Sequence, residues 1–296
     1  MTGPKDMFLI TGALILLMAL PALFNTKGAP LELIATLRPQ IIVVAFAFAC
    51  AAFTVGRFWS GGAAVLVVAV LLVTTPELFS RAPSPVTRPA MKVVWCNVFQ
   101  KNSVVERLAT LAQKQTADVV ILAEPPRDLA RARRALSDYP FVYGAPDPGE
   151  HGAVVFSRAP LTERPRSDLP PGVYPLAIVE TDQIRIVAMH PPVAVSPSAM
   201  KASTAMMAAA LDEAAAGRTL VIGDMNATPW SHRLRVVSKQ MVRLTPALGS
   251  TWFSSLPVLG LPIDHAFVTS DLRASTTVGP GVGSDHLPLI VSIARD

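Results

Sequence analysis

Two polar residues, Asp224 and Asn226, follow directly after the short apolar run of residues 219–222. Alternate residues of an extended chain point to the same side, so a carboxylate and an amide would lie together at the end of this predicted strand. Strand ends are where layered α/β proteins usually bind their ligands. Aspartate and asparagine are also common turn residues. The pair alone therefore leaves two interpretations open, a functional site and an ordinary turn.

The same combination of an apolar run and a polar end recurs along the chain. Further polar residues stand at the ends of predicted strands: Asn97, Glu124, His190, Asp264, Asp285 and His286. Taken singly, each could be a turn residue, a helix cap, a solvated carboxylate or a buried histidine. Together they offer carboxylates, amides and imidazoles, which are the groups that bind metal ions and transfer protons. The combination favours a chemical site over a set of independent turns.

The elements that must position these residues belong to the C-terminal two thirds of the chain. Helices are predicted over 103–115, where Ser103 and Glu106 form a capping-box pattern, and over 127–137 and 196–215. Short strands are predicted over 92–98, 118–124, 141–143, 153–157, 176–180, 184–190, 219–222, 263–269 and 287–292. Short strands joined both by tight turns and by helices are typical of a layered α/β protein with a mixed or antiparallel sheet.

The N-terminal third has a different composition. Three apolar runs lie at about 7–24, 41–57 and 61–78, each near the lower end of the roughly 17–25 residues that cross a bilayer. They predict a three-helix transmembrane anchor over 1–80, followed by a proline-rich linker at 81–90 and a catalytic domain at 91–296. A cleaved signal peptide is the alternative for the first run. Basic residues, counted alone, favour a cytoplasmic catalytic domain.

Charge and cysteine content narrow the possible partners. The whole chain carries +5, but residues 90–296 hold 20 Lys and Arg against 18 Asp and Glu, a net charge of +2. A duplex-DNA-binding domain usually has a stronger basic surface, so nucleic acid is the less favoured partner. Cys50 and Cys96 offer neither a disulfide framework nor a zinc motif.

The ordered set of strand-end residues resembles the endonuclease/exonuclease/phosphatase family, which includes DNase-like nucleases, inositol-polyphosphate phosphatases and neutral sphingomyelinases. The motifs that carry the resemblance are Gly223-Asp224-Met225-Asn226 and Ser284-Asp285-His286, in the family's order. The resemblance covers residues 91–296. It implies a four-layer α/β sandwich, two packed mixed sheets flanked by helices, and hydrolysis of phosphate esters with a divalent cation.

The resemblance also implies roles for individual residues. It makes Glu124 the principal ligand of Mg²⁺, with Mn²⁺ as the alternative metal, and places Asn97 and Asp285 close to the ion. Ser157 and Arg158 resemble a family segment next to the site and are candidates for substrate binding.

The acid–base roles follow from the same resemblance. His286 would act as the general base or as an electrostatic partner at the phosphorus, oriented by Asp264. Asp224 and Asn226 would position the attacking water and hydrogen-bond the scissile phosphate. His190 would hydrogen-bond or protonate near the leaving oxygen.

Anchor and site together predict the substrate class. A catalytic domain tied to the bilayer favours a lipid-linked phosphate or pyrophosphate. The architecture resembles membrane members of this family that are associated with glycopeptide resistance, act on polyprenyl pyrophosphate and face outward. This resemblance predicts a multi-pass protein of the inner (plasma) membrane with an extracytoplasmic catalytic domain. The alternatives are a membrane-tethered endonuclease or phosphodiesterase, and a non-catalytic binding module.

Overall fold

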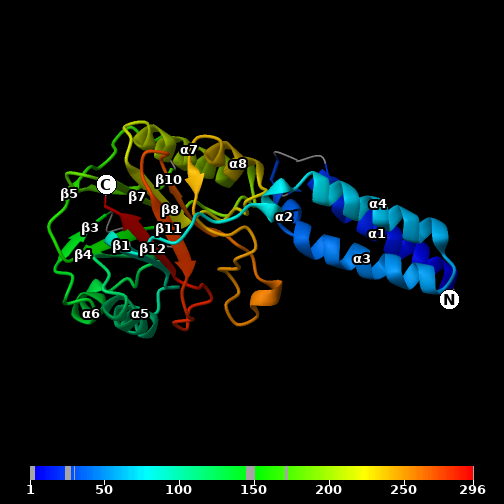
Figure 1. The fold of residues 1–296 in the computed structure, drawn as a ribbon, viewed down its shortest axis with the longest axis horizontal. Helices are drawn as coiled ribbons and strands as arrows, with labels where there is room; N and C mark the ends of the chain where they lie inside the picture. The colour runs from blue at the N-terminus through cyan, green and yellow to red at the C-terminus, as the bar shows by residue number, and fades with distance from the viewer. Residues whose placement is uncertain (1–3, 24–27, 30, 145–150, 171–172, 296) are drawn as a thin grey trace.

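The computed structural model describes the chain except for residues 1–3, 24–27, 30, 145–150, 171–172 and 296. Figure 1 shows two parts, an α/β body that contains all the labelled strands and an N-terminal helical bundle that projects from it. The first residue of β1 is Pro89, so the body begins close to the predicted domain start at residue 91.

The first sheet has six strands in the order β11-β12-β1-β2-β4-β3. Their bounds are Ala274–Val278, Leu289–Ala294, Pro89–Asn97, Val119–Ala123, Ala153–Ser157 and Phe141–Tyr143, in that order. Only β1 and β2 pair in parallel, with Asn97 opposite Ala123; β12 runs antiparallel to β1. All five residues of β2 are buried, as expected for a strand that is covered on both faces.

The second sheet repeats this plan in the order β5-β6-β7-β8-β10-β9. Its strands span Thr162–Glu163, Ala177–Glu180, Arg185–Met189, Thr219–Asp224, Asp264–Val268 and Val242–Arg243. Again one central pair, β7 and β8, is parallel, and the neighbouring β10 is antiparallel to β8. Gly223 is required here because a side chain would meet the carbonyl oxygen of Met189 at 2.1 Å.

The two sheets pack face to face over a shared core of buried aliphatic residues and Trp95. The outer face of the first sheet is covered by α5 (Asn102–Lys114) and α6 (Leu129–Ala135). The outer face of the second sheet is covered by α7 (Pro197–Ala214) and α8 (His232–Ser238). The predicted sandwich of two mixed sheets flanked by helices is therefore confirmed.

Three of the four described helices of the body begin with a side-chain cap. Asp128 accepts from the backbone of Ala130 at the start of α6. Ser196 accepts a hydrogen bond from the backbone of Ala199 at the start of α7, and Ser231 caps α8 in the same way. The predicted capping box at Ser103 is wrong. Helix α5 begins one residue earlier, after Lys101, and Glu106 bonds Arg131 of α6 at 2.8 Å instead. Glu106 therefore joins α5 to α6 instead of capping α5.

The bundle consists of α1 (Pro4–Leu23), α3 (Arg38–Thr54) and α4 (Phe58–Val73), with a short helix α2 (Leu31–Thr36) at its junction with the body (Figure 1). Small and branched side chains such as Ala45 and Leu71 form its core. Helix α4 is followed by the short 3₁₀ helix η1 (Pro76–Phe79).

None of the helices over the described residues is both long enough and apolar enough to cross a membrane. The three predicted spans are thus not supported. The apolar runs at 41–57 and 61–78 are cut short, because Gly56 adopts a positive φ of 74° at the turn and Pro76 begins η1. The observed helices α3 and α4 have 17 and 16 residues.

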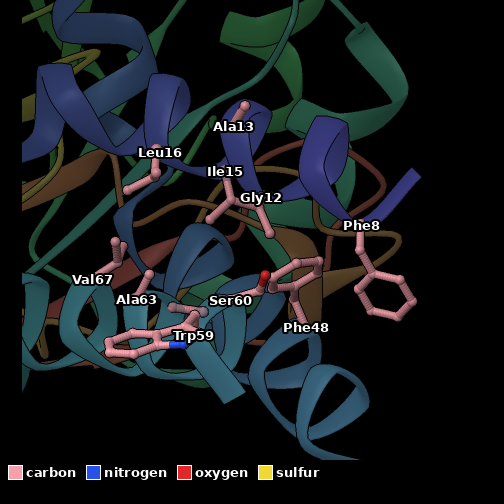
Figure 2. Close-up of a pocket in the computed structure, with 11 residues that line it drawn as sticks. Phe8, Gly12, Ala13, Ile15, Leu16, Phe48, Trp59, Ser60, Ala63 and Val67 are labelled. Atoms are coloured by element: carbon pink, nitrogen blue, oxygen red, sulfur yellow. The ribbon is translucent and has the colours of Figure 1, made fainter. Parts of the chain in front are cut away.

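An apolar groove of about 380 Å³ lies between the long helices of the bundle. Figure 2 shows Phe8, Phe48 and Trp59 around it, together with small residues such as Gly12 and Ala63. Several aliphatic and aromatic side chains outside the groove are also exposed on α1, α3 and α4. Apart from its narrow core, the bundle therefore presents an apolar surface.

Candidate active site

The strand topology brings the polar strand ends together at one edge of the sandwich. In the first sheet, the parallel register of β1 and β2 places Asn97 beside the start of the turn that contains Glu124. In the second sheet, the register of β7 and β8 places His190 beside Asp224. Antiparallel pairing sets Asp264, the first residue of β10, opposite Asp224.

Asn97 joins the two sheets. Its side-chain amide donates to Glu124 Oε1 at 2.9 Å and to Asp224 Oδ2 at 3.1 Å. Its own carbonyl oxygen Oδ1 accepts from the backbone of Phe99. One amide therefore holds two carboxylates from different sheets within hydrogen-bonding distance of the same nitrogen.

Two of the site residues have an unusual backbone conformation. Glu124 and Asn226 adopt positive φ angles of 46° and 45°, which non-glycine residues rarely do. Each follows the end of a parallel strand. In the second case the Asp224 side chain accepts a hydrogen bond from the backbone of Asn226 at 3.0 Å, an Asx turn. Asp224 and Asn226 do share a side, as predicted, but through this turn rather than through an extended chain.

His190 lies within reach of three of these groups. Its Nε2 is 3.3 Å from the amide nitrogen of Asn226, 3.5 Å from Asp224 Oδ2 and 3.8 Å from Glu124 Oε1. Asn226 also donates to the carbonyl of Pro191 at 3.0 Å, which fixes the amide. His190 is 3% exposed, so a substrate would reach its imidazole only from the cleft.

His286 and Asp264 form the strongest polar pair of the site. His286 Nδ1 lies 2.8 Å from Asp264 Oδ2, and the other oxygen of Asp264 accepts from Trp95 Nε1 at 2.8 Å. The backbone of Asp264 donates to Thr251 Oγ1. His286 Nε2 then points toward Asp224, at 3.6 Å from its Oδ2. The Asp264 carboxylate is therefore in position to orient the His286 imidazole through Nδ1.

Burial and charge shift the pKa values of this cluster in opposite directions. Burial by itself disfavours the charged forms of Asp264 and His286. The positive charge and hydrogen bond of His286 nevertheless hold the pKa of Asp264 below its usual range. For His286, burial is overcome by the carboxylates of Asp264 and Asp224, which raise its pKa to about 10. Burial raises the pKa of Asp224 and also that of Glu124. The imidazolium–carboxylate pair is thus the stable form of His286 and Asp264.

Asp285, next to His286 in the sequence, also lines the cleft. Its Oδ2 accepts from Trp252 Nε1 at 3.3 Å and its Oδ1 from Ser284 Oγ at 3.2 Å. Ser284 also donates to the backbone carbonyl of Asn97 at 2.7 Å. This bond ties the loop before β12 to the end of β1, and with it the position of Asp285.

The oxygen donors fit a hard divalent cation. Glu124 is a largely buried carboxylate that accepts a hydrogen bond from Asn97 and lies near the carboxylate of Asp224. A bound cation would offset the desolvation of the Glu124 carboxylate and its repulsion by Asp224. Asp224, Asp264 and His286 also form a compact group of possible ligands. We favour the cleft carboxylates, because both oxygens of Asp264 and Nδ1 of His286 are already engaged with each other and with Trp95.

These groups open into a cleft of about 740 Å³. Its polar lining comes from the residues above. Its apolar lining includes Val193, Leu261 and Ile263 of the body and Leu33 of α2, which also contributes Thr36. The N-terminal segment therefore reaches the candidate active site.

Ser157 and Arg158 are not part of this cluster, contrary to expectation. Ser157 pairs with Val119 at the beginning of β2, whereas Glu124 follows its end. Arg158 donates to the carbonyl of Ala117 and stacks on the ring of Tyr139, 4.6 Å from its centroid. The antiparallel pairing of β2 and β4 carries both residues to the opposite edge of the sheet, where they stabilise the fold.

Other residues of the site were not anticipated. Trp95 and Trp252 hold the two aspartates through their indole nitrogens, and His151 lies over His190 with ring centroids 5.4 Å apart. Trp95 lies inside an apolar run and Trp252 in a segment of mixed composition, and neither position signals a polar role. His151 in front of an apolar strand repeats the pattern of the other site residues and could have been found by it.

Comparison with known proteins agrees with this geometry. A model described as "Endonuclease/Exonuclease/phosphatase family" matches residues 94–286. This range contains every residue of the cluster described above.

Solved structures share the fold of the body at low sequence identity. A 3′ phosphatase from Neisseria bound to a product DNA hairpin is 17% identical, with a TM-score of 0.56, and the match covers 70% of this chain and 100% of that one. TDP2 from C. elegans is 12% identical (TM-score 0.54; 84% and 89% covered). The endonuclease domain of TRAS1, a telomere-specific non-LTR retrotransposon, is 15% identical (0.52; 70% and 99%). No curated protein matches the sequence.

Proposed function

Because the chain belongs to the endonuclease/exonuclease/phosphatase family, whose members hydrolyse phosphate esters with divalent cations, we propose that it is a membrane-associated hydrolase of lipid-linked phosphate or pyrophosphate. The observation that carries the hydrolytic part is the convergence of Asn97, Glu124, Asp224, Asp264 and His286 from both sheets at one cleft. The membrane part of the proposal rests on the exposed apolar side chains of the N-terminal bundle, and the lipid part rests on the apolar residues that line the cleft.

The metal would be held in the cleft by Glu124 and Asp285, with Asn97 fixing the Glu124 carboxylate. Oxygen ligands of this kind suit Mg²⁺, with Mn²⁺ as the alternative. When bound, such an ion neutralises negative charge on the phosphoryl oxygens.

Water activation falls to the groups around Asp224. Burial raises the pKa of the Asp224 carboxyl, so this group can accept a proton from the attacking water. His286 lies between Asp264 and Asp224 and is suited to act as a cation against the phosphate rather than as the base. Asp264 keeps the imidazole oriented through Nδ1.

The phosphate and the leaving group would be handled by Asn226 and His190. The Asn226 amide nitrogen donates to the carbonyl of Pro191 and lies 3.3 Å from His190 Nε2, so the two side chains lie side by side at the cleft. A donor at that place can hydrogen-bond the scissile phosphate or protonate the leaving oxygen.

Association with a bilayer is supported by the surface of the bundle. Trp59 is 95% exposed and Val73 80%, and most of the other large side chains exposed on α1, α3 and α4 are aliphatic or aromatic. Contiguous apolar surface of this kind is typical of membrane or protein contacts. We place the protein at the inner (plasma) membrane with its catalytic domain on the extracytoplasmic side. Membrane fractionation and protease accessibility of spheroplasts test this location.

A nuclease is the second candidate, because a similar solved structure is a 3′ phosphatase bound to a DNA hairpin. Against it, none of the described residues that line the cleft is Lys or Arg. Nucleic-acid-binding clefts draw most of their affinity from such cations.

The deciding experiment assays the purified full chain in detergent with Mg²⁺. Phosphate release from polyprenyl pyrophosphate and nicking of plasmid DNA are measured side by side, with His286→Ala as the blank. We expect phosphate release that disappears in the variant and in EDTA. Nicking without phosphate release would reject the lipid substrate and favour the nuclease.

A further inference from the structure

The short helix α2 forms part of the wall of the active-site cleft. Leu33 and Thr36 line the same cavity as Glu124, His190 and His286, although about 90 residues separate α2 from the nearest of these in the sequence. Figure 1 shows α2 at the junction between the bundle and the sandwich. A segment that only tethered the enzyme would have no need to reach the cleft.

Trp230 fixes the end of α2. Its indole nitrogen donates to the backbone carbonyl of Ala35 at 3.0 Å and to that of Thr36 at 3.1 Å. The last carbonyls of a helix have no partner within the helix, so this indole satisfies groups that would otherwise remain unpaired. Trp230 is 1% exposed, and the contact is therefore part of the packed interior.

Arg233 connects α2 with the catalytic loop. Its Nε lies 2.9 Å from Glu32 Oε1, and its Nη2 donates to the backbone carbonyl of Asn226 at 3.1 Å. The side chains of Arg233 and Glu32 are only 4% and 3% exposed. Buried ion pairs contribute little net stability but fix geometry, so this pair sets the position of α2 relative to Asn226.

The cleft is lined by two kinds of side chain. Carboxylates and imidazoles line it together with the apolar residues Leu33, Val193, Leu261 and Ile263. Phe99 stands at the cleft with 49% of its surface exposed. A ligand that carries both a phosphate and an apolar group can therefore contact both kinds of side chain.

We propose that α2 and the apolar residues of the cleft form a subsite for the hydrocarbon chain attached to the scissile phosphate, with Leu33 as a specificity-determining residue. This inference rests on the proposed phosphoester hydrolysis and deepens it, because it makes the N-terminal segment part of the active site. The occupant is a linear alkyl or prenyl chain. The absence of Lys and Arg among the described lining residues disfavours a polyanion.

Binding of phosphonates to the full chain tests the subsite without catalysis. Hexylphosphonate and methylphosphonate contain no P–O–C bond that could be hydrolysed, and they differ only in the length of the alkyl chain. With Mg²⁺ present, calorimetry should find hexylphosphonate bound about tenfold or more tightly, since each buried methylene favours binding. Equal affinity of the two ligands would overturn the proposal.

Three substitutions on the same helix make the test specific. Leu33→Asn should remove most of the preference for hexylphosphonate and leave methylphosphonate binding unchanged. Leu31→Asn makes the same change on α2 at a side chain that is 43% exposed and does not line the cleft, so it should alter neither. Leu33→Met should retain the preference. Equal weakening of both ligands by Leu33→Asn would overturn the subsite.

The two proposals can fail separately. If Leu33→Asn leaves the rate of polyprenyl pyrophosphate cleavage unchanged, the subsite is rejected and the proposed function is kept. A preference for hexylphosphonate that depends on Leu33, in a protein that releases no phosphate from lipids, would keep the subsite and reject the proposed substrate.

Discussion

The two sheets of the sandwich are built on one plan and supply different chemistry. Each has six strands with a single parallel pair at its centre, and each parallel pair is followed by a site residue with positive φ. The first sheet contributes the amide and carboxylates suited to a metal, Asn97, Glu124 and Asp285. The second contributes Asp224 and Asp264, which surround the imidazole of His286.

Several hydrogen bonds of the site join one sheet to the other. Asn97 of β1 donates to Asp224 of β8, and Trp95 of β1 donates to Asp264 of β10. His286, just before β12 of the first sheet, bonds Asp264 of the second. Each sheet alone would leave buried polar groups without partners, which is costly. The site is therefore a product of the sheet–sheet interface.

Breaking the pair His286–Asp264 should have the largest effect. Asp264→Asn keeps the shape but removes the negative charge that orients and stabilises the imidazolium, so kcat should fall by about 10²–10⁴. Because both residues act as one unit, the double variant with His286→Ala should be no slower than His286→Ala alone. Additive losses in phosphate-release assays would show that the sheets act independently.

Glu124→Gln should separate the roles of the two sheets. Loss of the carboxylate should weaken the apparent affinity for Mg²⁺ by at least about 10–100-fold, measured from the Mg²⁺ dependence of activity. Asp224→Asn is the matched variant from the second sheet and should lower kcat with a smaller change in Mg²⁺ dependence. If Asp224→Asn weakens the metal more than Glu124→Gln does, the assignment of metal binding to the first sheet is wrong.

Acid should destabilise the second sheet through His265 on β10. Burial, with Arg243 nearby, lowers the pKa of this histidine to about 4 from 6.5. As the pH falls, His265 is protonated in the unfolded chain before it is protonated in the folded chain. The stability that neutral His265 contributes is therefore complete above about pH 6.5 and is lost as the pH falls toward 4, by at most about 3 kcal/mol.

His265→Gln should therefore flatten the dependence of the unfolding free energy on pH between 6.5 and 4. Denaturant titrations at several pH values measure this slope, whatever the absolute stability of the variant. An unaltered slope in His265→Gln would mean that another group senses the acid.

Trp95→Phe should give the smallest change. It removes the hydrogen bond to Asp264 Oδ1 and leaves that buried oxygen without its donor, which costs about 1–3 kcal/mol of unfolding free energy. The bond to His286 remains, so the loss of activity should be smaller than in Asp264→Asn. Thermal unfolding and phosphate release on the same preparation compare the two.

Local pattern was sufficient to predict most of the body. Alternation and apolar runs encode strands directly, and polar residues at their ends identified Asn97, Glu124, His190 and Asp224. Parallel neighbours then place such ends at one edge, as the pairing of β7 with β8 does for His190 and Asp224.

The family resemblance was misleading for Ser157 and Arg158. Ser157 ends β4 and Arg158 follows it, and because β4 runs antiparallel to β2, both lie at the edge of the sheet opposite to Glu124. In the N-terminal third, composition predicted helices well. It could not predict where α3 and α4 end, because single residues such as Gly56 and Pro76 decide it.

The sequence by itself determined which residue types stand at the ends of the strands, since periodicity and turn chemistry are local properties of the chain. Only the tertiary structure decided that Trp95 supports Asp264, that Trp252 supports Asp285, and that Leu33 of α2 reaches the cleft. These contacts join residues that are far apart in the sequence, and they form only when two sheets and a helix pack against one another. Burial of apolar surface drives that packing without regard to which polar partners it brings together.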